Sequence, residues 1–163
     1  MKYTLIILVT FCLVCCSKST FNSKWTKETA PPTYTARYET SKGNFDIEVT
    51  RAWSPAAADR LHQSLKQHFY DNTLFYRVVS NFVVQFGNIG TTVTKQWDKF
   101  KVPDEPVLKS NLKGYVSYAR AGKETRGNDL FINLKDNARL DTVHAEGIVG
   151  YPVLGKVVNG MEW

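Results

Sequence analysis

Hydrophobic and polar residues alternate along much of the chain from residue 35 onward, in short runs separated by turn residues. In TARYETSKGNFDIEVT (35–50), apolar positions recur at every second residue on both sides of Ser41-Lys42-Gly43-Asn44. A period of two around a central turn is typical of a β-hairpin. Further short strands are predicted in the two runs of 75–88 on either side of Ser80-Asn81, and in 114–119, 129–133 and 154–158.

One stretch has the helical period instead. Ser54-Pro55 combines a good N-cap residue with proline at the first helical position. An apolar stripe then follows at four-residue spacing, formed by Leu61, Leu65 and Phe69. This predicts a helix over residues 55–69. One amphipathic helix among many short strands favours a closed β-barrel with a helix at one end.

The first sixteen residues, MKYTLIILVTFCLVCC, have the pattern of a targeting segment. Lys2 gives a positive start, and the apolar run of residues 5–14 is too short to span a bilayer. The end of this run resembles a bacterial lipoprotein signal, which implies that Cys16 becomes the lipidated N-terminus. Cys15 is the alternative lipidation residue. An ordinary cleaved signal and an N-terminal anchor helix are the alternatives to the lipoprotein reading.

Residues 17–33, SKSTFNSKWTKETAPPT, are rich in Ser, Thr and Lys and show no helical or strand period. We expect a flexible tether here and one domain over residues 34–163. All three cysteines lie within residues 1–16, so the domain contains none. This excludes a disulfide framework or a cysteine-ligated zinc site in the domain.

Charge and motif content exclude several functions. The net charge is +6, but no dense Lys/Arg run with interleaved aromatic residues is present, so a nucleic-acid partner is not expected. A basic surface favours an anionic membrane instead. The sequence has no G-x-S-x-G, no H-E-x-x-H and no phosphate-binding glycine loop. His62 and His68 lie off the apolar stripe without a further ligand set, so we predict no metal site.

Four segments occur in a characteristic order: YDNTLFYRVVSNFVVQFGN (70–88), GYVSYARAG (114–122), DLFINL (129–134) and GYPVLGKVVNGME (150–162). With the Ser-Pro helix start, they resemble the cyclophilin family of peptidyl-prolyl cis/trans isomerases, over about residue 37 to the C-terminus. The resemblance implies an eight-stranded antiparallel barrel capped by two helices. It also implies accelerated rotation about X–Pro bonds of polypeptide substrates, without a metal or cofactor.

The chemistry of that reaction suits an arginine. Resonance holds the X–Pro amide planar with a barrier of roughly 18–20 kcal/mol, and no covalent bond has to break. A guanidinium that donates to the proline nitrogen stabilises the twisted amide, because the nitrogen lone pair localises there. Arginine stays charged, and its planar guanidinium group holds the N–H donors in fixed directions. By the resemblance, Arg77 occupies the catalytic position.

The resemblance also assigns the substrate-binding residues. Phe82, Val83 and Phe131 would line an apolar seat for the proline ring, and Gln85 would bond the substrate backbone and aim Arg77. Strand parity agrees, because Arg77 and Gln85 alternate oppositely to their apolar neighbours. The remaining positions implied to contact the peptide are Ala119, Arg120, Asp129, Leu140 and Tyr151. From the residue type alone, core packing is the favoured role for Phe82 and Phe131, and Arg77 is consistent with an ion pair such as one to Asp71.

Four departures from the family pattern stand out. Asp129 replaces a glutamine that contacts the substrate, and a carboxylate accepts hydrogen bonds but cannot donate them. Arg139 replaces an aromatic residue at the rim. Phe86 and Asn88 replace a small and an acidic residue, with effects expected on packing and the turn. The chain ends at Trp163, before the second helix and closing strand, so we expect a C-terminally truncated domain.

The leading hypothesis is a monomeric, exported, lipid-anchored prolyl isomerase that assists protein folding in the bacterial cell envelope or periplasm, with the outer membrane favoured. The first alternative is a non-catalytic module of the same fold that binds proline-containing peptides or acts as a chaperone. Asp129, Arg139 and the early end favour it. The second alternative is a purely structural lipoprotein.

Overall fold

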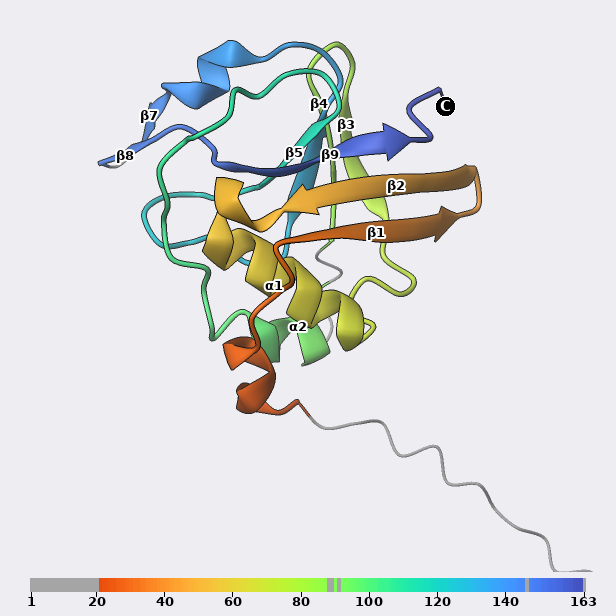
Figure 1. The fold of residues 1–163 in the computed structure, drawn as a ribbon, viewed down its shortest axis with the longest axis vertical. Coiled ribbons are helices and arrows are strands. Elements are labelled where there is room, and N and C mark those ends of the chain that lie inside the picture. The colour runs from red at the N-terminus through yellow and green to blue at the C-terminus, as the bar shows by residue number, and fades with distance from the viewer. Residues whose placement is uncertain (1–20, 88–89, 91, 146, 163) are drawn as a thin grey trace, which may run out of the picture.

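Short antiparallel strands form the framework of the protein (Figure 1). The computed structural model describes residues 21–87, 90, 92–145 and 147–162. The strands are β1 (Thr33–Thr40), β2 (Gly43–Thr50), β3 (Phe75–Val79), β4 (Val83–Phe86), β5 (Tyr115–Tyr118), β6 (Leu130–Asn133), β7 (His144–Ala145), β8 (Ile148–Val149) and β9 (Val153–Asn159). The helices are η1 (Ser23–Lys27), η2 (Arg51–Trp53), α1 (Pro55–Lys66), α2 (Thr92–Trp97) and η3 (Ala138–Asp141). Every strand predicted from the period of two is therefore present.

One curled sheet carries the fold. Within the described residues its order is β1-β2-β9-β5-β6-β4-β3, and all neighbouring strands are antiparallel. β7 and β8 form a separate two-stranded sheet. The predicted mainly β, barrel-like architecture is confirmed, in the form of a seven-stranded half-barrel whose edges are β1 and β3. Helix α1 crosses below β1 and β2 in Figure 1, with α2 and η1 further below.

The N-terminus of α1 is capped by a side chain distant in sequence. Ser54 precedes the helix as predicted, but its hydroxyl donates to the carboxylate of Glu105. The same carboxylate accepts from the backbone N–H of Ala56 at 2.7 Å and of Ala57 at 3.3 Å. The guanidinium of Arg126, which is fully buried, donates to it at 2.9 Å. Glu105 thus satisfies the free N–H groups of the helix start.

The helix ends three residues before the predicted position 69. Its last residue is Lys66, and His68 adopts a left-handed backbone conformation with φ 55°. The N–H of Phe69 turns back to the carbonyl of Ser64 at 3.0 Å, so Phe69 is still buried in the core. Phe69, the last residue of the predicted apolar stripe, therefore enters the core from the turn after the helix and not from the helix itself.

The predicted tether differs from the structure over residues 21–33. Helix η1 forms there, and the ring of Phe21 meets that of Trp97 edge-on with centroids 5.2 Å apart. Trp25 stacks on Trp97 at 6.4 Å. The pattern of residues 17–33 does not reveal this, because two aromatic residues, Phe21 before η1 and Trp25 within it, are too few to show a period. Helix α2, which bears Trp97, was likewise not predicted, since six residues are too few to show a period.

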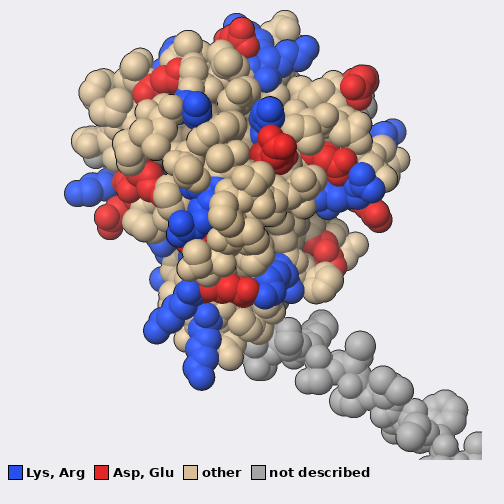
Figure 2. Space-filling view, viewed as in Figure 1, with Lys and Arg blue, Asp and Glu red and all other residues tan. Residues whose placement is uncertain are grey.

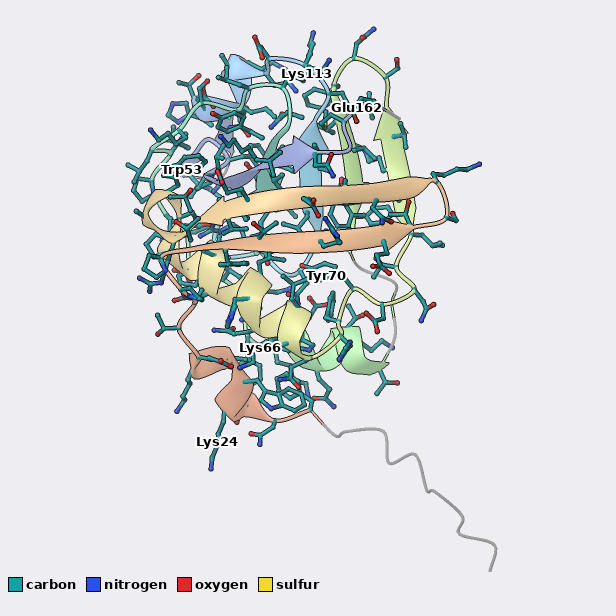
Figure 3. The ribbon with its side chains drawn as sticks, turned by 45° about the vertical axis from the view of Figure 1, so that its right-hand side comes forward. Lys24, Trp53, Lys66, Tyr70, Lys113 and Glu162 are labelled. Carbon is teal, nitrogen blue, oxygen red and sulfur yellow. The ribbon has the colours of Figure 1, made fainter. Side chains whose placement is uncertain are left out.

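The main core lies between α1 and the concave face of the sheet. It contains strand residues of β2, β4, β5, β6 and β9 together with Leu61 of α1 and Trp97 of α2. In the view of Figure 3, α1 lies against the side chains of β1 and β2, with Tyr70 just beyond its end. Tyr70 is buried, and its hydroxyl donates to the carbonyl of Asn128 at 3.0 Å. The convex face of the sheet near β4 and β6 remains available for a site.

Candidate active site

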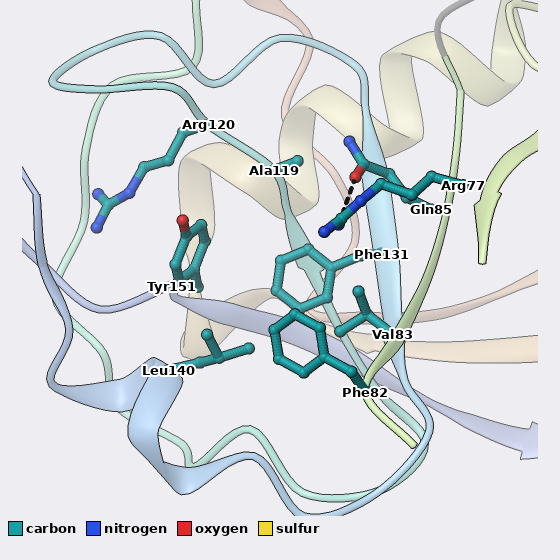
Figure 4. A pocket seen from close by; sticks show the side chains of 9 residues that line it. All are labelled: Arg77, Phe82, Val83, Gln85, Ala119, Arg120, Phe131, Leu140 and Tyr151. Carbon is teal, nitrogen blue, oxygen red and sulfur yellow. Dashed lines mark hydrogen bonds between the residues drawn. The ribbon is translucent and has the colours of Figure 1, made fainter. Parts of the chain in front are cut away.

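Strands β3 and β4 bring the predicted arginine and glutamine together. Arg77 pairs with Gln85 in the antiparallel register, after an irregularity between Phe75 and Arg77. The Nη1 of Arg77 donates to Oε1 of Gln85 at 3.3 Å (Figure 4). Val84 and Phe86 enter the main core from the opposite face of β4. The alternation inferred from the sequence therefore places both polar side chains on the outer face.

A second apolar cluster, distinct from the main core, lies on this outer face. Val83, Phe131 and Leu140 are its buried members. Phe131 is opposite Gln85 in the β4–β6 register, and its ring meets that of Tyr151 edge-on at 5.6 Å. Phe82 and Ala119 are packed against the cluster and half-exposed. Phe82 and Phe131 therefore contribute to a surface seat and not to the main core.

A hollow of about 180 Å³ opens over this cluster. Nine of the ten predicted site residues line it together: Arg77, Phe82, Val83, Gln85, Ala119, Arg120, Phe131, Leu140 and Tyr151 (Figure 4). In that view Arg77 points from one side toward the ring of Phe131, with the amide of Gln85 beside its guanidinium, and Leu140 and Tyr151 lie on the other side. The hollow is smaller than the pockets of roughly 300 Å³ and more that hold drug-sized ligands, and it suits one small ring.

The tenth residue, Asp129, lies outside the lining of the hollow. Its Oδ1 accepts a hydrogen bond of 2.8 Å from the hydroxyl of Tyr76 on β3. Burial, together with this bond to the carboxylate, raises the pKa of Tyr76 above its usual value. The backbone carbonyl of Asp129 accepts from the N–H of Ala119 at 2.8 Å, so the residue still adjoins the hollow.

Two further guanidinium groups stack on the aromatic rings of the site. Arg120 lies over the ring of Tyr151 at 5.0 Å, donates to the carbonyl of Gly150 and approaches Asp104 at 3.4 Å. Arg139 lies over the ring of Phe82 at 4.7 Å. Cations over aromatic faces are attracted by the ring quadrupole. Arg139 therefore lies at the rim of the hollow, at the position where the family pattern has an aromatic residue.

Buried asparagines, which no sequence pattern singled out, fix the loops of the site. The Nδ2 of Asn137 donates to the carbonyl of Phe82 at 2.9 Å and to Oδ1 of Asn133 at 2.9 Å. Asn133 in turn donates to Oδ1 of Asn111 at 3.2 Å, and Asn111 donates to the carbonyl of Tyr151 at 2.9 Å. Because buried polar groups are costly to leave unpaired, this network holds Phe82 and Tyr151 in place.

A close backbone approach also shapes the site. Gly87 follows β4 with φ 129°, and a Cβ at this position would lie 2.4 Å from the carbonyl oxygen of Asn128. Only glycine fits there.

Phe86 is buried in the main core, as expected for a packing residue. Asn88 and Cys16 lie outside the described residues. Within those residues, no group of three or more His, Cys, Asp or Glu side chains is placed to hold a metal ion.

The geometry unites a guanidinium with free N–H donors, a glutamine that orients it and a shallow apolar seat. A family model described as "Cyclophilin type peptidyl-prolyl cis-trans isomerase/CLD" matches residues 35–163. The chain belongs to this family.

The chain is similar to curated members of this family from bacteria, a plant and fungi. The chain is 35% identical over 130 residues to peptidyl-prolyl cis-trans isomerase A of Dickeya dadantii, covering 76% of this chain and 65% of the relative. It is 30% identical over 126 residues to a peptidyl-prolyl cis-trans isomerase of Acinetobacter baylyi, covering 76% and 66%. It is 33% identical to peptidyl-prolyl cis-trans isomerase CYP18-2 of Arabidopsis thaliana, covering 83% and 79%. The chain thus spans slightly less than two thirds of the two bacterial relatives.

Solved structures share the fold. A cyclophilin-type isomerase of Cryptosporidium parvum, crystallised in the presence of the dipeptide Ala-Pro, superposes with a TM-score of 0.65 at 23% identity, covering 79% of this chain and 81% of that one. The cyclophilin AquaCyp293 of Hirschia baltica superposes with a TM-score of 0.61 at 17% identity, covering 88% and 73%. The half-barrel with its covering helix is therefore the cyclophilin fold.

Proposed function

We propose that this protein is a peptidyl-prolyl cis/trans isomerase that acts on proline-containing polypeptides. One observation carries the proposal: the guanidinium of Arg77, held by Gln85 at 3.3 Å, stands beside an apolar hollow of single-ring size. The related proteins named as isomerases support it. We expect it to act as a monomer and to use no cofactor.

In the proposed mechanism, the proline ring sits on Phe131 between Phe82 and Leu140. Arg77 then donates a hydrogen bond to the proline nitrogen as the amide twists and its lone pair localises. That bond is strongest in the twisted state, so it lowers the barrier of roughly 18–20 kcal/mol without favouring either planar isomer. Gln85 limits the directions that the guanidinium can take, which keeps the donor in place before the reaction.

The test compares the purified chain with Arg77→Ala in a protease-coupled assay on an Ala-Pro peptide. Loss of one aimed donor typically costs about 10²–10³ in rate, and we expect kcat/KM to fall by that order. Arg77→Lys should recover little, because an ammonium lacks the planar fork. Arg37→Ala, which removes an exposed arginine of β1 paired with Asp46, is the control and should keep full activity. Equal rates for the wild type and Arg77→Ala would refute the proposal.

A non-catalytic proline-binding module is the second candidate, and it is favoured by the position of Asp129. The carboxylate adjoins the hollow but only accepts hydrogen bonds, so it cannot donate to a substrate carbonyl. Such a module would show peptide-induced NMR shifts at Phe82 and Phe131 without faster exchange between cis and trans peptide signals. Observing exchange enhancement that depends on Arg77 would exclude it.

For the location, we propose an exported lipoprotein of the bacterial cell envelope, anchored through Cys16 and facing the periplasm, with the outer membrane favoured. The signal-like pattern of residues 1–16 supports this proposal. So does the exposure of Lys24 and Lys27 on η1, near the start of the described chain. Lys24 lies at the lower end of the molecule in Figure 3, and Figure 2 shows Lys and Arg side chains projecting from that end. Within the described residues, no helix is long and apolar enough to cross a membrane.

Metabolic labelling with a palmitate analogue in a bacterial host tests the anchor. We expect label on the wild type, none on Cys16→Ala, and unchanged label on Cys15→Ala. Label that is lost only with Cys15→Ala would move the anchor to the alternative residue. The absence of label on all three proteins would refute the lipoprotein proposal.

A further inference from the structure

The charged side chains that line the hollow are all positive, whereas the carboxylate of Asp129 adjoins it from outside the lining. Of the nine residues that line it, the charged ones are Arg77 and Arg120, and no aspartate or glutamate side chain is among them. Arg139 adds a third cation over the outer part of Phe82, and Leu140, the next residue of η3, lines the hollow itself. A bound peptide therefore meets a positive surround.

These three cations differ in how far their charge is compensated. Arg120 is nearly buried, approaches Asp104 at 3.4 Å and donates to the carbonyl of Gly150. The guanidinium of Arg77 donates a hydrogen bond to the neutral amide of Gln85. Arg139 is exposed, and among the described residues no carboxylate forms an ion pair with it.

The acids near Arg139 in sequence are held by other groups. Asp141 accepts from the hydroxyl of Ser110 and, at 2.8 Å, from both the backbone and the side-chain nitrogen of Asn111. Asp136 accepts from the backbone N–H of Lys113 at 2.9 Å. These two carboxylates therefore do not pair with Arg139, and its guanidinium can bind a ligand at the rim.

Given the proposed function, the position of Arg77 determines how a bound peptide is oriented in the hollow. The proline nitrogen has to face Arg77, and this nitrogen carries the residue that precedes proline. That residue therefore lies on the side of Arg77, Gln85 and Ala119. The chain after proline leaves from the neighbouring Cα. In the proposed pose it runs away from Ala119, past Phe82 and Leu140, which lie across the hollow from Ala119 in Figure 4. Arg139, stacked on Phe82, borders this exit.

We propose that Arg139 is a specificity-determining residue that favours substrates with an acidic residue directly after the proline. The inference rests on the proposed isomerase activity and names its substrate class. Planar guanidinium forks bind carboxylates well, and stacking on Phe82 limits the orientations that Arg139 has to lose on binding. Because the rim is exposed, the preference is modest and depends on salt.

The experiment measures cis/trans exchange by NMR in blocked peptides that differ only in the residue after proline, which is Glu, Gln or Lys. For the wild type in about 10 mM salt, we expect kcat/KM for the Glu peptide to exceed that for the Gln peptide by about two- to fivefold, with the Lys peptide lowest. The difference should shrink at about 1 M salt. Arg139→Gln should remove the preference, and Arg139→Glu should turn it toward Lys. Lys135→Gln, a change of an exposed cation four residues away, is the control and should keep it.

Three results would overturn the inference. They are equal rates for the Glu and Gln peptides, a preference that survives in Arg139→Gln, and a preference for Glu only when it precedes proline. Failure of the isomerase proposal is distinguishable, because no peptide would then exchange faster with any variant. In that case the same peptides still report on Arg139 through their dissociation constants, read from NMR shifts at Phe82.

Discussion

At the scale of single residues, the site depends on which polar side chains point into the hollow and which are hydrogen-bonded to groups outside it. Arg77 and Gln85 could be placed correctly from strand parity, because a period of two leaves only one alternative face. The contact between Tyr76 and Asp129 could not, because Tyr76 is on β3 and Asp129 precedes β6, with β4 between these two strands. Which of several acceptors a hydroxyl chooses depends on distances of a few tenths of an ångström, and no sequence pattern encodes them.

Asp129→Gln is expected to raise kcat/KM for X–Pro peptides by about two- to tenfold, the worth of one net hydrogen bond. The glutamine amide donates to a substrate carbonyl, which the carboxylate cannot do. Asp129→Asn also removes the charge, but its amide is one methylene group shorter than that of glutamine, so we expect a smaller rise in kcat/KM. If both variants are less active than the wild type, the carboxylate held by Tyr76 is itself required to shape the site.

At the scale of elements, the structure shows how segments distant in sequence stabilise one another. Glu105 caps α1 across 51 positions of the chain, and Asn137 holds the carbonyl of Phe82 across 55. The segment before β1 is fixed in the same way, because the N–H of Ala30 donates to Asp59 of α1 at 2.8 Å. The helix and strands themselves were predictable from local patterns, but their caps and ties were not, since such partners share no local pattern.

Asp59 provides a pH-dependent part of the stability. Burial acts to raise its pKa, but hydrogen bonds from Arg51 and from the N–H of Ala30 outweigh this, so the pKa lies below its ordinary value. A carboxyl group with a lowered pKa in the folded state stabilises fully above its unfolded pKa of about 3.9. That contribution is lost as the pH falls through the folded value.

Asp59→Asn should therefore lower the free energy of unfolding by about 1–3 kcal/mol at neutral pH, and this deficit should shrink below about pH 4. Urea unfolding at a series of pH values measures it. Asp71→Asn is the control, because that carboxylate is exposed. A deficit that stays constant into acid would show that the charge of Asp59 is not responsible.

At the scale of the whole molecule, two apolar clusters on opposite faces of one sheet have different tasks. The main core between the sheet and α1 includes Phe86, whose ring lies 4.9 Å from that of Phe75 and is 2% exposed. The outer cluster forms the seat of the site. Stability and activity should thus be separable by residues only four positions apart.

Phe86→Ala should cost about 3–5 kcal/mol of stability, as expected for a buried aromatic ring. Phe82→Ala should cost at most about 1.5 kcal/mol, because the ring is half-exposed. Isomerase activity should show the reverse order, with Phe82→Ala losing about tenfold while folded and Phe86→Ala losing activity only as far as it unfolds. Chemical unfolding and peptide exchange measured on the same samples decide this. Equal losses of stability would contradict the separation of the two clusters.

The sequence by itself determined the strands and the start of α1, because periodicity and helix-start signals are local. It indicated the residues that meet at the hollow through the resemblance of its ordered motifs to cyclophilins. The tertiary structure decided what surrounds them. It placed η1 on Trp97 where a tether was expected, brought Glu105 to the start of α1, set Asp129 against Tyr76 and laid Arg139 over Phe82. Contacts of this kind form between side chains far apart in the chain, so their energy exists only once the sheet has curled and brought them together.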